Sequence, residues 1–188
     1  PEMGLMSAAL VEMGRFYGFP SASAGCTADA REAGAQAVLE KVITTITPVL
    51  SGADIIVGFG EVASDQLLIL EQIVVDNEIA HFCERVANGI DSEKVFTEDV
   101  IRVGPGGNFL AMKSTRAQAR SGEFLVPTLF DRHNTDQWIE LGKPSMYSMA
   151  RAKVREILAA PLVDPLPDSV IAELDEILAA ADEELKEQ

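Results

Sequence analysis

The stretch SASAGCTADAREAGAQAVLEKVITTITPVLSGADIIVGFG, residues 21–60, decides the fold. Its first five residues form a short strand candidate of small side chains, and apolar residues recur at helical spacing from residue 35 to residue 50. Ser51-Gly52 ends this helix, and the apolar run 53–60, closed by glycines, predicts a buried strand. We expect the inward stripe of the helix to consist of Ala35, Val38, Leu39, Val42, Ile46, Val49 and Leu50.

A second long helix is predicted over residues 67–90, and its first half is apolar nearly all round, which indicates deep burial. Two consecutive strand–helix units with short strands favour parallel pairing through right-handed crossovers. The fold class is therefore α/β. The pattern alone does not separate an open sheet from a (β/α)₈ barrel.

The pattern of strands and long apolar helices ends near residue 90. Residues 111–135 are irregular and polar, Pro144-Ser145 opens another helix, and a proline-rich connector covers residues 160–168 before a last helix from Asp168. We predict a strand-and-helix segment over residues 1–135 and a helical extension over residues 136–188. Because a helical pattern already includes Leu5, we expect the chain to be a C-terminal piece of something longer.

Composition restricts the class of protein. The 188 residues are 47% hydrophobic, and 15 lysines and arginines against 30 acids give a net charge of −15, which disfavours nucleic acid and anionic membranes as partners. No apolar run approaches the length of a membrane span. Cys26 and Cys83 lack any disulfide or zinc-binding spacing, so we expect a reducing, cytoplasmic setting.

Candidate site residues follow the two predicted strands. Ligands of parallel α/β proteins bind outside the carboxyl ends of the strands, where this chain has Cys26, Thr27 and Asp29 after the first strand and Phe59 and Glu61 after the second. Each has a purely structural alternative. Asp29 can cap the following helix, Cys26 can fill a small buried space, and Glu61 can be a first-turn acid.

Polar residues also gather within the apolar helix, as EQIVVDNEIAHF, residues 71–82. Glu78 and His81 lie three positions apart and are expected to share a face, with Glu71 two turns away on the same side. With only His81 and His133 in the chain, we predict no metal site. The cluster either binds the polar end of a substrate or forms structural hydrogen bonds.

The order and spacing of these stretches resemble the C-terminal part of the trimethylamine methyltransferase family. The resemblance covers about residue 14 to the end and includes residues 18–61, LEQIVVDNEIAHF, VGPGGNFL, FLVPTLFDR and LGKPSMYSMARAKVREIL. It implies that residues 1–135 are part of a larger (β/α)₈ barrel. It also implies transfer of a methyl group from a methylated amine to the Co(I) of a separate corrinoid protein, so that this chain binds no cofactor directly.

Trimethylamine enzymes of that family use a pyrrolysine, which the resemblance assigns to the segment matching residues 24–29. This segment contains only standard residues here, which implies a quaternary amine such as glycine betaine as substrate. By the same resemblance, Cys26, Thr27 and Asp29 form the floor or rim of the site, and Glu61 faces the ammonium charge. The remaining candidates, Phe59, Glu71, Glu78 and His81, are then expected to bind the rest of the substrate.

Two alternatives remain open at this point. Another barrel enzyme could use Glu61 as a general base. Alternatively, the chain could be a non-catalytic assembly module, because a partial barrel exposes strand edges and apolar helix faces. In either case we expect the chain to form a homo-oligomer.

Overall fold

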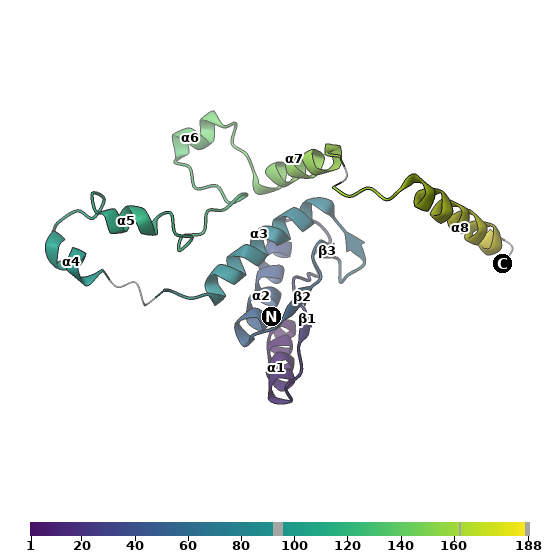
Figure 1. The fold of residues 1–188 in the computed structure, drawn as a ribbon, viewed down its shortest axis with the longest axis horizontal. Helices are drawn as coiled ribbons and strands as arrows, with labels where there is room; N and C mark the ends of the chain where they lie inside the picture. The colour runs from purple at the N-terminus through teal and green to yellow at the C-terminus, as the bar shows by residue number, and fades with distance from the viewer. Residues whose placement is uncertain (92–95, 162, 187–188) are drawn as a thin grey trace. The chain divides into compact units, whose positions relative to one another are not determined.

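The computed structural model describes residues 1–91, 96–161 and 163–186. Its described residues fall into two units, Pro1–Arg155 and Glu156–Gln188, and the predicted division at residue 135 stays a prediction. Figure 1 shows the elements in chain order: α1 (Glu2–Phe16), β1 (Ala22–Ala24), α2 (Ala35–Ser51), β2 (Ile55–Val57), β3 (Glu61–Val62), β4 (Leu67–Leu68), α3 (Leu70–Ala87), α4 (Thr97–Val103), α5 (Lys113–Gln118), α6 (Thr135–Glu140), α7 (Met146–Ala159) and α8 (Asp168–Lys186).

The strand–helix–strand unit is present as the sequence predicts. β1 and β2 pair in parallel with Ala22, Ser23 and Ala24 opposite Ile55, Ile56 and Val57, and α2 connects them. α2 packs against both α1 and α3 (Figure 1). The α/β class is therefore confirmed, whereas closure into a (β/α)₈ barrel stays a prediction.

The buried face of α2 differs in part from the predicted stripe, although Val38, Val42 and Ile46 do pack against the core. Leu39 and Leu50 are 66% and 59% exposed, whereas the fully or nearly buried residues are Ala37, Lys41, Thr44, Thr45 and Pro48. Small and polar side chains therefore occupy the face that lies against the strand ends. Burying polar side chains in such a place costs free energy unless they find hydrogen-bond partners.

The start of the second long helix also differs from the prediction. Leu67 and Leu68 belong to β4, which pairs antiparallel with β3, and α3 begins only at Leu70. All three leucines are exposed, so deep burial is wrong for the start of this apolar run, although Val75 and Ile79 further along α3 are buried. The hairpin uses Leu67 and Leu68 as an extended edge, and Ile69 is extended as well, which delays the first helical turn.

The core of the first unit lies along α3. Val75, Ile79 and Cys83 of this helix are buried together with Leu129 and with Ala150 of α7. Side chains of α2 complete the cluster from the other side. A second, smaller cluster lies beneath the strand ends and consists of Ala28, Ala30, Ala37 and Val62.

The part of the chain after α3 contains helices that are separated by loops. The helices expected near residues 144 and 168 are confirmed as α7 and α8, but α5 and the start of α6 interrupt residues 111–135, which we expected to be irregular. The predicted proline-rich connector, residues 160–168, includes residue 162, which is outside the described residues.

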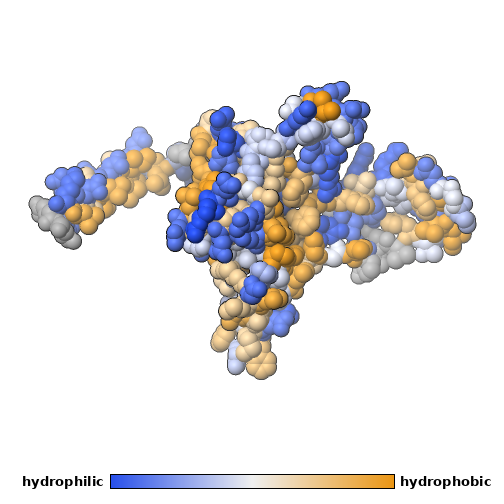
Figure 2. All heavy atoms as spheres, turned by 180° about the vertical axis from the view of Figure 1, so that it is seen from behind, coloured by the Kyte–Doolittle hydropathy of each residue, from blue (hydrophilic) through white to orange (hydrophobic). Residues whose placement is uncertain are grey.

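Apolar side chains remain on the surface of both units. On α8, taken by itself, an apolar stripe runs beside the charged side chains, as Figure 2 shows. On α1 the exposed members are Leu5, Met6, Leu10, Met13 and Phe16. In the described parts of the chain, no helix has both the length and the apolar character of a membrane span.

Candidate functional site

The carboxyl ends of β1 and β2 lie at the same edge of the sheet, and the backbone segments that follow them are in close contact. Gly58 follows β2 at φ +105°, and a Cβ placed on it would lie 2.5 Å from the carbonyl oxygen of Gly25. A Cβ on Gly25 would lie 2.8 Å from the carbonyl oxygen of Thr44 on α2. Side chains are excluded here because two backbones and a helix already fill the space. Internal packing thus accounts for these two glycines.

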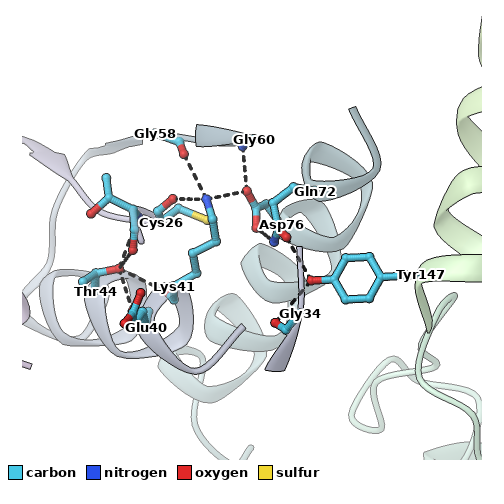
Figure 3. A network of polar contacts seen from close by, with 11 residues as sticks. Cys26, Gly34, Glu40, Lys41, Thr44, Gly58, Gly60, Gln72, Asp76 and Tyr147 are labelled. Atoms are coloured by element: carbon cyan, nitrogen blue, oxygen red, sulfur yellow. Dashed lines mark hydrogen bonds and ion pairs between the residues drawn. The ribbon is translucent and has the colours of Figure 1, made fainter. Parts of the chain in front are cut away.

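A lysine joins the two strand ends. The Lys41 side chain comes from α2 and is fully buried, and its ammonium group donates hydrogen bonds to the carbonyl oxygens of Cys26 and Gly58, the latter at 3.3 Å (Figure 3). It also forms an ion pair of 2.8 Å with the fully buried carboxylate of Asp76 on α3. One ammonium group therefore contacts backbone from both strand ends.

Asp76 extends this network in two directions. Its Oδ2 accepts a hydrogen bond of 2.6 Å from the backbone amide of Gly60, and its Oδ1 accepts one of 2.7 Å from the side-chain amide of Gln72. The oxygen of that amide accepts a hydrogen bond of 2.9 Å from the hydroxyl of Tyr147 on α7 (Figure 3). The buried charges thus have several polar partners each, which offsets the cost of removing them from water.

Cys26 lies inside this network rather than on an open rim. Its side chain is fully buried, and its backbone is left-handed at φ 55°. Burial, together with the smaller effect of the nearby Asp76 charge, raises the pKa of its thiol to about 12. The thiol is therefore protonated near neutral pH and is a poor nucleophile.

Thr27 and Asp29 line a cavity of about 310 Å³ that also contacts Glu40, Ser64 and Asp65. Thr27 is nearly buried, whereas Asp29 is exposed. The Asp29 carboxylate accepts a hydrogen bond of 2.8 Å from the Ser64 hydroxyl. The alternative role of Asp29 as a helix cap is wrong, because α2 begins at Ala35 after Gly34.

Glu40 holds the loop that carries Asp29. One oxygen of its carboxylate accepts the backbone amides of Asp29 at 2.8 Å and of Ala30 at 3.2 Å. The other accepts a hydrogen bond from the side chain of Gln36. Glu40 is therefore engaged in fixing the loop between β1 and α2.

Phe59 and Glu61 lie half-buried on the turn after β2, beside Gly60, whose amide is bound by Asp76. Glu61 belongs to β3, so its alternative role as a first-turn helical acid is wrong. Within the described residues, the Glu61 carboxylate has no hydrogen-bond or ion-pair partner. Its negative charge is thus available to a ligand.

The polar residues of α3 do not share one site. The Glu78 carboxylate is nearly buried and accepts hydrogen bonds of 2.9 and 2.6 Å from the backbone amide and hydroxyl of Thr128. The His81 side chain is 56% exposed and lies 3.7 Å from Glu84. The two positions are neighbours along α3, but the Glu78 side chain is buried against Thr128 and the His81 side chain is exposed, so they do not share one environment.

Glu71 has a third environment. Its carboxylate forms an ion pair of 3.0 Å with Arg151 of α7. A backbone hydrogen bond holds the pKa of Glu71 below its usual range, and the hydrogen bond from Arg151 is the second largest cause. Among the described residues no group of three or more His, Cys, Asp or Glu side chains is arranged to hold a metal ion.

Sequence reasoning missed Lys41, Gln72 and Tyr147. The available signal was the spacing of Lys41 from Ala37 and Thr45, four residues on either side, which places a lysine on a face of small residues. Gln72 and Asp76 are likewise four residues apart on α3. Their long-range partners are not encoded in any local pattern.

Parallel strands joined by a helix, with polar groups gathered at their carboxyl ends, define an α/β protein whose candidate site lies at the strand ends. The family model described as "Trimethylamine methyltransferase (MTTB)" matches residues 1–186. The chain belongs to the trimethylamine methyltransferase family.

Relatives within the family differ in the substrate that their names give. Trimethylamine methyltransferase MttB of Methanosarcina barkeri is 36% identical over 97% of this chain, and MttB of Desulfitobacterium hafniense is 29% identical over 98%. Glycine betaine methyltransferase of Desulfitobacterium hafniense is 31% identical over the whole chain. The chain spans only 37%, 37% and 40% of the lengths of these three relatives.

Proposed function

We propose that this chain is the C-terminal portion of a methyltransferase that moves a methyl group from a quaternary amine to the Co(I) of a separate corrinoid protein. The observation that carries the proposal is the family match over residues 1–186. A relative named as a glycine betaine methyltransferase supports the quaternary class of substrate, and so does the absence of pyrrolysine from residues 24–29.

The proposed reaction requires no general acid or general base. The electron pair of Co(I) forms the new Co–CH₃ bond, the N–CH₃ bond breaks, and its electron pair leaves with the amine, which becomes neutral. No proton moves, and no covalent bond to the protein forms. The protein has to hold the N–CH₃ axis toward the cobalt and keep water away. A protonated, buried Cys26 is compatible with this scheme because no enzyme nucleophile takes part.

Glu61 is the residue we assign to the ammonium charge. Its half-buried side chain begins β3, four residues after β2 ends, and has no partner in the described part of the chain. We assign Phe59, two residues earlier, to contact the methyl groups. Thr27 and Asp29 border the cavity of about 310 Å³, whose lining does not include Phe59 or Glu61. The assignment of Glu71, Glu78 and His81 to the rest of the substrate stays a prediction, as does a role for Cys26 in the floor of the site.

Reconstitution of the reaction tests the proposal. The full-length polypeptide that carries this chain is mixed with its Co(I) corrinoid protein, and formation of methylcobalamin is followed by absorbance with glycine betaine, tetramethylammonium or trimethylamine. We expect methyl transfer from a quaternary amine and none from trimethylamine. Absence of methylcobalamin with every quaternary amine, under conditions in which a known relative is active, would contradict the proposal.

Substitution of Glu61 tests its role. Removal of a full charge about 4 Å from a cation costs roughly 1–4 kcal/mol at effective dielectric constants between 80 and 20. We therefore expect Glu61→Gln to raise the KM for the amine about tenfold or more, and the exposed Glu84→Gln to leave it unchanged. If Glu61 were instead a general base, the enzyme would be active without the corrinoid protein and would show a bell-shaped pH profile. Loss of Glu61 would then lower kcat and abolish that profile.

A role in assembly is the second candidate, and the exposed apolar side chains of α1 favour it. Under this alternative, chain 1–188 alone forms defined oligomers but supports no methyl transfer. Size-exclusion chromatography with light scattering distinguishes an oligomer from a monomer.

A further inference from the structure

We propose that Lys41, Asp76, Gln72 and Tyr147 act as a positioning device, here named the strand-end clamp, that sets the geometry of the methyl-transfer site. The inference rests on the proposed function, because it assigns these residues a role in that same reaction. None of the four is a predicted contact of the substrate. Each acts through the backbone or side chain that it binds (Figure 3).

The clamp holds three backbone groups, and each is next to a proposed site residue. The carbonyl of Cys26 precedes Thr27, the carbonyl of Gly58 precedes Phe59, and the amide of Gly60 precedes Glu61. Within the described residues, the ion pair of Lys41 and Asp76 connects these three groups directly. This buried contact therefore links the two halves of the site, in addition to the backbone hydrogen bonds from Ala63 and Ser64 to Ala30 and Ala28.

Stability alone is a weak reason for such a contact. A buried ion pair loses hydration, and replacing one with well-packed apolar residues is often neutral or stabilising. Charged groups do fix the orientation of the groups that they bind, because each hydrogen bond restricts both a distance and an angle. A methyl transfer that depends on alignment requires this kind of fixation.

The clamp also links the site to α7. The Tyr147 hydroxyl donates to the Gln72 oxygen at 2.9 Å, which leaves the Gln72 amide nitrogen to donate to Asp76 at 2.7 Å. Loss of the hydroxyl would leave the Gln72 oxygen without its donor, so the amide would keep only its bond to Asp76 and would be oriented less firmly. Burial raises the pKa of Tyr147, so its hydroxyl stays a donor at neutral pH.

Tyr147→Phe is the variant that tests the inference. It removes one oxygen atom at the end of the clamp and leaves the Lys41–Asp76 pair in place, so the protein is expected to fold. Tyr17→Phe is the matched control, since Tyr17 is the only other tyrosine and is 62% exposed. Both variants are made in the full-length polypeptide that carries this chain.

Two measurements are made on each variant. Hydrogen–deuterium exchange of residues 58–62 should become about tenfold faster in Tyr147→Phe, because the Asp76 carboxylate that accepts the Gly60 amide is then held less firmly by Gln72. With the corrinoid protein and a quaternary amine, kcat per folded enzyme should fall about 10- to 100-fold while KM changes less than twofold. Tyr17→Phe should match the wild type in both.

The outcomes separate the inference from the proposed function. Unchanged exchange of residues 58–62 in Tyr147→Phe overturns the inference, whether or not methyl transfer is observed. A wild-type kcat in Tyr147→Phe also overturns it, while the proposed function stands. If the wild type transfers no methyl group from any quaternary amine, the proposed function fails, and with it the assignment of the clamp to that reaction.

Discussion

Replacement of Lys41 by methionine provides a direct measure of what the buried network contributes to stability. Methionine keeps most of the length and volume of lysine but removes the ammonium group. The Asp76 carboxylate, which is fully buried, then loses its counterion, and the carbonyls of Cys26 and Gly58 lose a donor. Breaking a buried pair from one side costs about 3–5 kcal/mol. Since a domain is stable by only about 5–15 kcal/mol, Lys41→Met should lose a large fraction of its stability.

The double variant Lys41→Met/Asp76→Val distinguishes a network from a simple pair. If the two charges mattered only to each other, their joint removal would restore stability or increase it. Here the Gly60 amide, the Gln72 amide and two backbone carbonyls lose their partners, and each buried unpaired group costs about 1–3 kcal/mol. Allowing for partial relaxation, we expect the double variant to remain about 3 kcal/mol less stable than the wild type.

Urea unfolding followed by circular dichroism measures these free energies, with the slope m compared among variants. The exposed Lys113→Met on α5 is the control, and it should change stability by less than about 0.5 kcal/mol. A double variant at least as stable as the wild type would refute the reasoning, because it would show that the backbone groups find other partners.

Three further predictions concern other parts of the site. The Cys26 thiol should resist a thiol reagent at pH 8 in the folded protein and react once urea unfolds it, because burial raises its pKa from 9.0 to about 12. The same shift makes stability fall as pH rises from about 9 to 12, where only the unfolded chain ionises, and Cys26→Ala should remove that part of the fall. Gly58→Ala should lose about 2–4 kcal/mol, since φ is +105° and the added methyl meets a carbonyl at 2.5 Å. Glu78→Ala should lose about 1–3 kcal/mol and speed proteolysis near residue 128, because its carboxylate binds that backbone.

Matched variants give each of these predictions a control. Gly89→Ala has a positive φ of 63° but nothing within 4 Å of its Cβ, so it should cost less than the change at Gly58. Glu84→Ala removes an exposed carboxylate from the same helix as Glu78 and should leave stability nearly unchanged. Rapid labelling of folded Cys26, equal losses in the two glycine variants, or equal proteolysis of the two glutamate variants would contradict the respective argument.

The order of elements was accessible from the sequence because it depends on local patterns. Apolar spacing located α2 and α3, the glycines after residue 57 ended β2, and the connection length favoured parallel pairing. The position of the candidate site at the strand ends followed from that topology. The hairpin of β3 and β4 was missed, since its leucines match a helix as well as a strand.

The sequence by itself determined a parallel strand–helix–strand unit and the family, and it indicated the strand ends as the expected place of a site. Only the tertiary structure decided which face of α2 is buried and which polar groups meet there. The reason is physical: burial of Lys41 is tolerated only because Asp76, 35 residues further along the chain, supplies the opposite charge. A local pattern assigns a lysine to solvent by default, and its partner becomes visible only once α2 and α3 are packed together.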